Sequence, residues 1–214
     1  MSVATARSDD IFLPEAFGRR ARQRLAPIAP GTGVAAGERV LNPEFEPPRG
    51  FLMRPAAVLI PVVARDTATV LMTRRTATLR RHAGQISFPG GTIDAGDADA
   101  GAAALREAQE EIGLDPALVE PLGRLDPYIA PTGFHITPVV AVVDPEHRLV
   151  LNPHEVDLAF EVPLAFLMSP QNHRIGSREF DGVRHSFYEM PYDDHYIWGI
   201  TAGIIRGLYE RLFA

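Results

Sequence analysis

Residues 98–114 read ADAGAAALREAQEEIGL, and this stretch predicts the clearest helix of the chain, over residues 98–112. Alanine and leucine favour the helix interior, and either Asp97 or Asp99 can cap the first turn. Gly113 can end the helix, because glycine readily adopts the left-handed conformation found at helix C-termini. Both ends of the helix are therefore marked in the sequence.

The predicted helix has two faces of opposite character. At about 100° per residue, Leu105, Ala108 and Ile112 share one face, which can pack against a core. The other face carries three carboxylates, those of Glu107, Glu110 and Glu111. Like charges one turn apart cost roughly 0.2–0.5 kcal/mol per pair, which Arg106 partly relieves. The carboxylates form either a solvated acidic face or a site for a hard divalent cation.

The segments on both sides of this helix predict a mixed sheet. Apolar runs bounded by turn residues predict strands over 56–63, 68–73, 123–128, 137–143 and 158–162. A hairpin is expected over 174–190, with its turn at Asp181–Gly182, and further helices over 14–25 and 197–213. Strands mixed with a few helices indicate an α+β or α/β sandwich.

The composition fits one globular domain with an extension. The 214 residues are 46% hydrophobic and 22% charged, which supports a packed core. We expect residues 1–50 to form a partly helical, irregular arm and residues 51–214 to form the main domain. The absence of cysteine excludes disulfides and thiol catalysis.

Charge and hydropathy also exclude several kinds of partner. The formal net charge of −6 argues against bulk binding of nucleic acid. No apolar run approaches the roughly 18–20 residues of a membrane span, and the N-terminus lacks the apolar segment of a secretory signal. We therefore expect no membrane association and a cytoplasmic location.

The acidic helix belongs to a longer pattern. Gly91 is followed after five residues by Asp97 and, after eight more, by R-E-x-x-E-E-x-G-L at 106–114. By average residue frequencies, R-E-x-x-E-E-x-G arises by chance in on the order of one in ten thousand chains of this length. A metal centre explains this pattern better than a solvated face does.

The pattern resembles the Nudix box, G-x5-E-x7-R-E-U-x-E-E-x-G-U, in which U is apolar. Residues 106–114 match it completely if Ala108 counts as apolar, whereas Asp97 replaces a glutamate and the spacer to Arg106 is one residue longer. The resemblance implies a Nudix-type α/β/α sandwich over residues 51–214, with a mixed sheet and a loop–helix–loop motif. It also implies metal-dependent hydrolysis of a nucleoside diphosphate linked to another group.

The resemblance assigns roles to this motif, with Mg²⁺ or Mn²⁺ as the cofactor. The implied metal ligands are Glu107 and Glu111, with a backbone carbonyl near Gly90 or Gly91 completing the site. Glu110 would be either a further ligand or a group that orients the water. Arg106 would support the glutamates. A carboxylate beside the metal-held water can act as general base, and Glu107, Glu110 and Glu155 are all candidates. The sequence leaves this choice open.

An upstream segment resembles a narrower motif. Residues 71–91, LMTRRTATLRRHAGQISFPGG, are similar to L-L-T-x-R-[SA]-x3-R-x3-G-x3-F-P-G-G, which marks Nudix enzymes acting on coenzyme A. Met72 and Thr76 depart from it. The run YIWGITAGII at 196–205 is also similar to that subfamily.

The arginines of this segment suit a substrate with several phosphates. Coenzyme A carries a 3′-phosphate besides its diphosphate, and a guanidinium binds phosphate with two parallel hydrogen bonds. The predicted substrate-binding residues are Arg75 and Arg80, with Arg74 behind them, together with Gly90 and Phe88. Phe88 either stacks on adenine or packs in the core.

The predicted function is hydrolysis of coenzyme A, with acyl-coenzyme A as a further candidate, to 3′,5′-ADP and 4′-phosphopantetheine. Two alternatives stay open: a Nudix hydrolase of ADP-ribose or a dNTP, and a non-catalytic Nudix-fold ligand sensor. The expected partner is a small-molecule substrate. Nudix proteins often dimerise, so a homodimer is one expected arrangement.

Overall fold

A long parallel pair of strands forms the centre of the fold. The computed structural model describes residues 8–28, 36–37, 40–44, 53–77, 82–180 and 183–214. In it, β2 (Arg54–Val63) pairs in parallel with β8 (Phe134–Val143), from Arg54 opposite Phe134 to Val63 opposite Val143. The near-continuous apolar runs of both strands suit positions that are covered on both faces.

The other strands of the main sheet extend this pair on both sides. On one side, β2 pairs with β3 (Thr69–Arg75) and β5 (Gly90–Thr92), and β3 pairs with β4 (Ile86–Ser87) and β9 (Val156–Pro163). On the other side, β8 pairs with β6 (Val119–Arg124) and β7 (Tyr128–Ile129), and β1 (Ala36–Gly37) pairs with β7. Both parallel and antiparallel pairs occur, so the sheet is mixed, as predicted.

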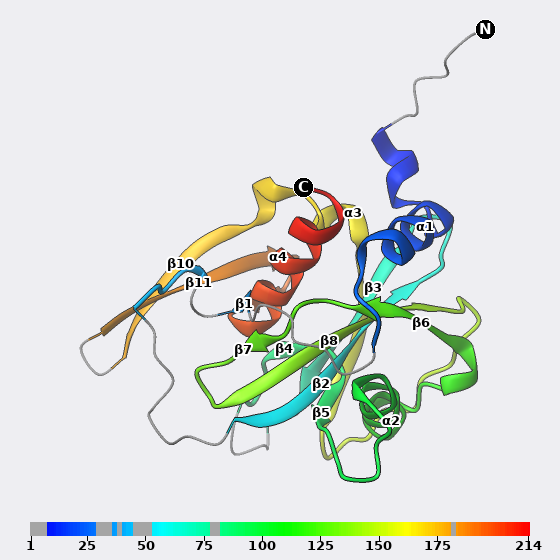
Figure 1. Ribbon diagram of the computed structural model, residues 1–214, viewed down its shortest axis with the longest axis horizontal. Helices are drawn as coiled ribbons and strands as arrows, with labels where there is room; N and C mark the ends of the chain where they lie inside the picture. Colours follow the sequence, from blue (N-terminus) through cyan, green and yellow to red (C-terminus); the bar gives the residue numbers. More distant parts are fainter. Residues whose placement is uncertain (1–7, 29–35, 38–39, 45–52, 78–81, 181–182) are drawn as a thin grey trace, which may run out of the picture.

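Helices cover both faces of this sheet (Figure 1). Ile60 and Val62 of β2 belong to the core shared with α1 (Pro14–Arg24) and α4 (Ile200–Leu212). Leu59 and Val63 belong to the core beneath α2 (Ala100–Ile112). Each fully buried side chain of this size contributes roughly 1.5–3 kcal/mol. The alternation of strand side chains thus builds the predicted α/β/α sandwich.

A second, smaller sheet stands beside the main one. It contains β10 (Arg174–Phe180), β11 (Val183–Tyr192) and β12 (His195–Trp198), all antiparallel. The β10–β11 ribbon extends to the left in Figure 1, and α4 packs against β11. The remaining helical segments are short: α3 (Leu164–Leu167) and 3₁₀ turns over Ser8–Phe12, Pro116–Leu118 and Pro170–Asn172.

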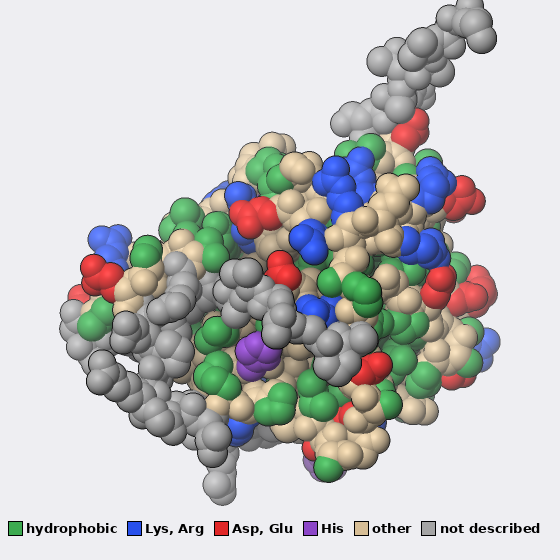
Figure 2. All heavy atoms as spheres, viewed as in Figure 1, with side chains coloured by type: hydrophobic (Ala, Val, Ile, Leu, Met, Phe, Trp, Pro, Cys, Tyr) green, Lys and Arg blue, Asp and Glu red, His purple; other side chains and the backbone are tan. Residues whose placement is uncertain are grey.

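The predicted helix near the N-terminus is present as α1 and packs on the domain. Phe17 of α1 is fully buried in the core that it shares with α4. Arg20 and Arg24 donate hydrogen bonds to the carbonyl of Leu212, at 2.9 and 3.2 Å. These bonds satisfy a carbonyl at the end of α4 that has no partner within the helix. Figure 2 shows basic side chains gathered over α1.

The helix predicted over 98–112 is confirmed, and its caps are now defined. It runs from Ala100, and Asp99 rather than Asp97 is the N-cap, because its Oδ1 accepts a hydrogen bond from the N–H of Ala102 at 2.9 Å. Gly113 ends the helix in the left-handed conformation, with φ of 66°. The capping rules therefore located both ends within two residues.

Two other elements also differ from the prediction. The helix predicted over 197–213 begins at Ile200, because Trp198 pairs with β11 and Gly199 turns the chain at φ of 63°. The strand predicted over 123–128 is divided between β6 and β7. The hairpin over 174–190 is confirmed by the β10–β11 register, although Asp181–Gly182 lie outside the described residues, as does much of the predicted arm. No helix among the described residues is long and apolar enough to span a membrane.

Candidate active site

Glu111 is a buried carboxylate at the end of α2. Its side chain is 3% exposed, and its Oε2 accepts a hydrogen bond of 3.3 Å from the N–H of Gly90. The Nη1 of Arg75 lies 3.6 Å from its Oε1. Burial raises the pKa of Glu111 to about 8, with Glu155 and Glu107 adding to the effect and Arg75 opposing it. The ionised form of Glu111 would therefore be stabilised by a positive charge in addition to that of Arg75.

Glu107 lies one turn earlier, against the bare backbone of Gly91. A Cβ built on Gly91 would lie 2.5 Å from the Oε1 of Glu107, so only glycine leaves room for this carboxylate. Burial raises the pKa of Glu107, whereas a hydrogen bond from Arg106 lowers it. Strand β5 and helix α2 thus approach each other so closely that the β5 backbone contacts both glutamates.

Arg106 is held at the edge of this carboxylate group. Its Nε and Nη2 donate to the two carboxylate oxygens of Asp97 at 3.0 and 2.9 Å. Its Nη1 donates to Glu107 at 3.0 Å and to Glu110 at 3.3 Å. The fork geometry fixes the guanidinium firmly, and the same contact lowers the pKa of Asp97. Asp97, which stands where the Nudix box has glutamate, therefore orients Arg106.

Glu155, directly before β9, lies near the same carboxylates. The N–H of Thr76 donates to its carbonyl at 2.9 Å, and Arg75 is paired with the neighbouring Val156 across β3 and β9. Its Oε1 accepts a 3.0 Å hydrogen bond from the side chain of Asn152. The charge of Glu155 raises the pKa of both Glu107 and Glu111, so the three carboxylates share one electrostatic environment.

The donor set fits a divalent cation. Glu107, Glu111 and Glu155 supply only carboxylate oxygens, which are the ligands that hard cations prefer. The three negative charges repel one another, and a bound cation would offset this repulsion. No three acidic or histidine side chains of the described residues have their ligand atoms gathered around one point. Oxygens of Glu107 and Glu111 instead face Arg106 and Arg75. Glu110 lies at the margin, with its side chain 55% exposed.

A cavity of about 600 Å³ opens beside this centre. Its wall includes β5, whose backbone also contacts the glutamates, and the cations Arg54 and Arg75. A second compartment of about 390 Å³ shares Ile86 and Ile200 with the first and adds two aromatic walls, Phe187 and Trp198. The cleft therefore runs from a cationic end near the carboxylates to an apolar end at the smaller sheet. Such a size suits an organic ligand.

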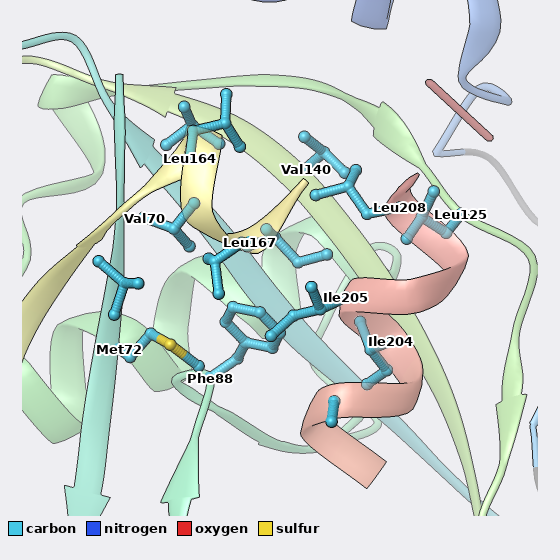
Figure 3. Packing of buried hydrophobic residues seen from close by; sticks show 14 of the residues in the cluster. Val70, Met72, Phe88, Leu125, Val140, Leu164, Leu167, Ile204, Ile205 and Leu208 are labelled. Atoms are coloured by element: carbon cyan, nitrogen blue, oxygen red, sulfur yellow. The ribbon is translucent and has the colours of Figure 1, made fainter. Parts of the chain in front are cut away.

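The other residues predicted to bind substrate lie in different environments. Arg75 and Gly90 line the larger compartment. Arg74 points away from it and donates to Asp157 at 2.7 Å. Arg80 lies outside the described residues. Phe88 lines the cavity but is only 4% exposed, and Figure 3 shows its ring among Met72, Leu167 and Ile205, the packing environment of a core residue.

The sequence did not single out Arg54 and Phe134, which line the same cavity. The guanidinium carbon of Arg54 lies 4.0 Å from the centre of the Phe134 ring. The two residues are 80 positions apart and meet because they are register partners in β2 and β8. Only the strand register, which the sequence does not state, identifies this pair.

Comparisons with known proteins bear on the family of this chain. The model of the NUDIX domain matches residues 53–197. The Nudix hydrolase NudL of Cronobacter sakazakii, described as uncharacterized, is 44% identical, over 72% of this chain and 81% of its own. NudL of Klebsiella pneumoniae (strain ATCC 700721), described in the same way, is 42% identical over 75% and 84%. The NUDIX domain of Shewanella oneidensis NrtR, solved with ADP ribose, has a TM-score of 0.48 at 18% identity and covers 83% of this chain and 99% of that one.

This chain belongs to the Nudix hydrolase family. Enzymes of the family hydrolyse diphosphate linkages and generally use divalent metal ions, in keeping with the all-carboxylate centre on α2. The match begins at residue 53, whereas α1 lies upstream of it and shares a core with α4.

Proposed function

We propose that this protein hydrolyses the diphosphate of coenzyme A, with Mg²⁺ or Mn²⁺, to 3′,5′-ADP and 4′-phosphopantetheine. The observation that carries the proposal is the two-ended cleft. Arg54 and Arg75 lie in the compartment beside the glutamates, and Phe187 and Trp198 line the continuation. Coenzyme A has the same polarity, because its nucleotide end is highly charged and its pantetheine arm is long and uncharged.

The continuation of the cleft favours this substrate over a shorter one. The second compartment adds about 390 Å³, and its described lining contains no arginine, lysine or acidic residue. A dNTP, whose phosphates end the molecule, offers nothing apolar to fill such a space. An acyl chain on the thiol of coenzyme A would extend the arm further. Burial of apolar surface in the compartment then adds to binding energy.

In the proposed reaction, water attacks one phosphorus of the diphosphate and the bridging P–O bond breaks. The bond electrons go to the departing phosphate oxygen, and the proton of the water goes to a carboxylate. A divalent metal, when bound, would neutralise charge on the diphosphate and make the attacking water more acidic. Glu107, Glu111 and Glu110 would hold it with the backbone near Gly91, and Arg106 would support the helix glutamates.

Glu155 is our favoured general base. It shares the electrostatic environment of Glu107 and Glu111, and in the described residues no arginine forms an ion pair with it. Asn152 orients its carboxylate by a hydrogen bond of 3.0 Å. Glu107 and Glu110 are the alternatives, and both contact Arg106.

The test is substrate profiling of the purified protein with Mg²⁺ or Mn²⁺. Coenzyme A, an acyl-coenzyme A, dephospho-coenzyme A, ADP-ribose and dNTPs are compared, with products separated by chromatography. We expect the highest kcat/KM for coenzyme A or its acyl derivative. Preference for ADP-ribose or a dNTP would reject the substrate and keep the family activity. Inactivity on every diphosphate would favour a ligand sensor.

The matched controls are Glu107→Gln and Glu110→Gln. Both remove one charge from the same helix, but Glu107 is largely buried against Gly91 and Glu110 is exposed. We expect Glu107→Gln to lower kcat at least about a hundredfold, as the loss of a metal ligand or base does. Glu110→Gln should have the smaller effect. Full turnover by Glu107→Gln would remove Glu107 from the catalytic group.

The metal identity, a homodimer and a cytoplasmic location stay predictions. The metal can be identified by adding single ions to chelator-treated protein and measuring turnover.

A further inference from the structure

Arg54 is a cation that faces the cavity with no acidic partner among the described residues. Several other arginines do have an acidic partner, as Arg65 has Glu161 at 2.7 Å. Among the described residues, the guanidinium of Arg54 stacks on the ring of Phe134 and makes no ion pair. Because Arg54 lines the cavity that contains Gly90, an anionic ligand can reach it.

The strand register holds this arginine in place. Arg54 and Phe134 face each other in the parallel β2–β8 pair, and neighbouring strands lie about 4.8 Å apart. The next pair on the same face, Ala56 and Ile136, also lines the cavity. The aromatic ring supports one face of the guanidinium through a cation–π contact and leaves its edge, with the N–H groups, available.

Arg54 lies away from the place where a scissile diphosphate would sit. Ala57 of β2 is paired with Gly91, which contacts Glu107. Arg54 precedes Ala57 by three residues, and at about 3.3 Å per residue this separates it from the Gly91 pair by about 10 Å along the strand. Arg75, in contrast, lies beside Glu111 at the carboxylate centre. The cavity therefore has two cationic positions at different distances from the reaction.

We infer that Arg54, positioned by Phe134, binds a phosphomonoester of the nucleotide that lies outside the scissile diphosphate. In coenzyme A this group is the 3′-phosphate, and the identification of the nucleotide rests on the proposed function. A ribose separates the 3′-phosphate from the diphosphate, so the two need separate cations. A guanidinium edge matches phosphate oxygens with two parallel hydrogen bonds. Arg54 is a specificity residue, and Phe134 is a positioning residue.

The test compares two nucleotides that differ only in this phosphate. Binding of 3′,5′-ADP and of AMP is measured by calorimetry with the full-length protein, which requires no turnover. We expect the wild type to bind 3′,5′-ADP more tightly. Arg54→Gln should weaken binding of 3′,5′-ADP about tenfold or more, as loss of a hydrogen bond to a charged group does, and should change AMP binding much less.

Two further variants separate charge from position. Phe134→Leu keeps an apolar side chain and removes the ring, so we expect a smaller loss that is again confined to 3′,5′-ADP. Arg184→Gln removes an exposed arginine of β11 that contacts Ser177, outside both compartments, and should leave the ratio of the two affinities unchanged.

Equal losses for both nucleotides in Arg54→Gln would overturn the inference, because they would place Arg54 at the base or the 5′-phosphate. No loss for either nucleotide would equally overturn it. Turnover supplies a second readout, since Arg54→Gln should lower the ratio of kcat/KM for coenzyme A to that for dephospho-coenzyme A. A wild type that hydrolyses neither would reject the proposed function, whereas the nucleotide titration would still decide the role of Arg54.

Discussion

Replacing Glu111 by glutamine tests whether the buried charge of this residue lowers the stability of the folded protein when no metal is bound. Glutamine keeps the size of the side chain and an oxygen that can accept from the N–H of Gly90, but it removes the charge. Glu111 is almost fully buried, and this burial raises its pKa from 4.5 to about 8. The folded state therefore binds a proton over a pH range in which the unfolded chain releases it.

The sign and size of the effect follow from this difference. Because the pKa is raised in the folded state, metal-free wild type should lose stability as pH rises from about 4.5 to about 8. At about 1.4 kcal/mol per pH unit, the upper limit is roughly 5 kcal/mol. Arg75 and rearrangement of the neighbouring carboxylates reduce it, so we expect about 2 kcal/mol or more. Glu111→Gln should lack this pH-dependent loss.

The assay is urea unfolding in the presence of a chelator at pH 5 and at pH 8. From pH 5 to pH 8, Glu111→Gln should become more stable relative to wild type. Glu110→Gln, at an exposed position, should not. Adding Mg²⁺ at pH 8 should stabilise wild type through preferential binding to the folded state and leave Glu111→Gln nearly unchanged. If the free energy of unfolding changed equally with pH in wild type and in Glu111→Gln, the reasoning that Glu111 carries a buried, uncompensated charge would be refuted.

Three further predictions follow from individual contacts. Gly91→Ala should fold with little loss of stability but lower kcat at least about tenfold, because its Cβ would meet only the movable carboxylate of Glu107, at 2.5 Å; normal turnover would contradict this. Gly90→Ala should lower stability by about 1–3 kcal/mol in urea unfolding, because its Cβ would lie 2.3 Å from the rigid carbonyl of Ala57; unchanged stability would show that the strands separate easily. Trp198 is the only tryptophan of the chain, so its fluorescence in the presence of a chelator should respond more to an acyl-coenzyme A than to coenzyme A. An equal response would place the acyl chain elsewhere.

The carboxylates of α2 were predictable because a helix places them by short-range geometry. Positions three and four apart lie on one side of any α-helix, so the shared face of Glu107 and Glu111 needed no knowledge of the rest of the fold. The capping residues Asp99 and Gly113 act on the same short range. Local chemistry therefore suffices for this half of the site.

The start of the last helix was less predictable because two structures compete for the same apolar residues. Ile197 and Trp198 continue the apolar pattern of α4, so periodicity favours a helix from 197 onward. In the folded protein, Ile197 pairs with Met190 and Trp198 with Glu189 on β11, and the turn at Gly199 separates strand from helix. The strand places Trp198 in the wall of the cleft, where a helical first turn would have placed it differently.

The other half of the site depends on long-range strand register. Glu155 reaches the glutamates of α2 because β9 pairs with β3, where Arg75 stands opposite Val156. Arg54 reaches Phe134 because β2 and β8 are aligned in parallel. Shifting either pairing by one residue would turn alternate side chains to the opposite face of the sheet and separate these groups. A helix motif thus locates the proposed site of hydrolysis, whereas the proposed substrate contacts form only when the strands have found their register.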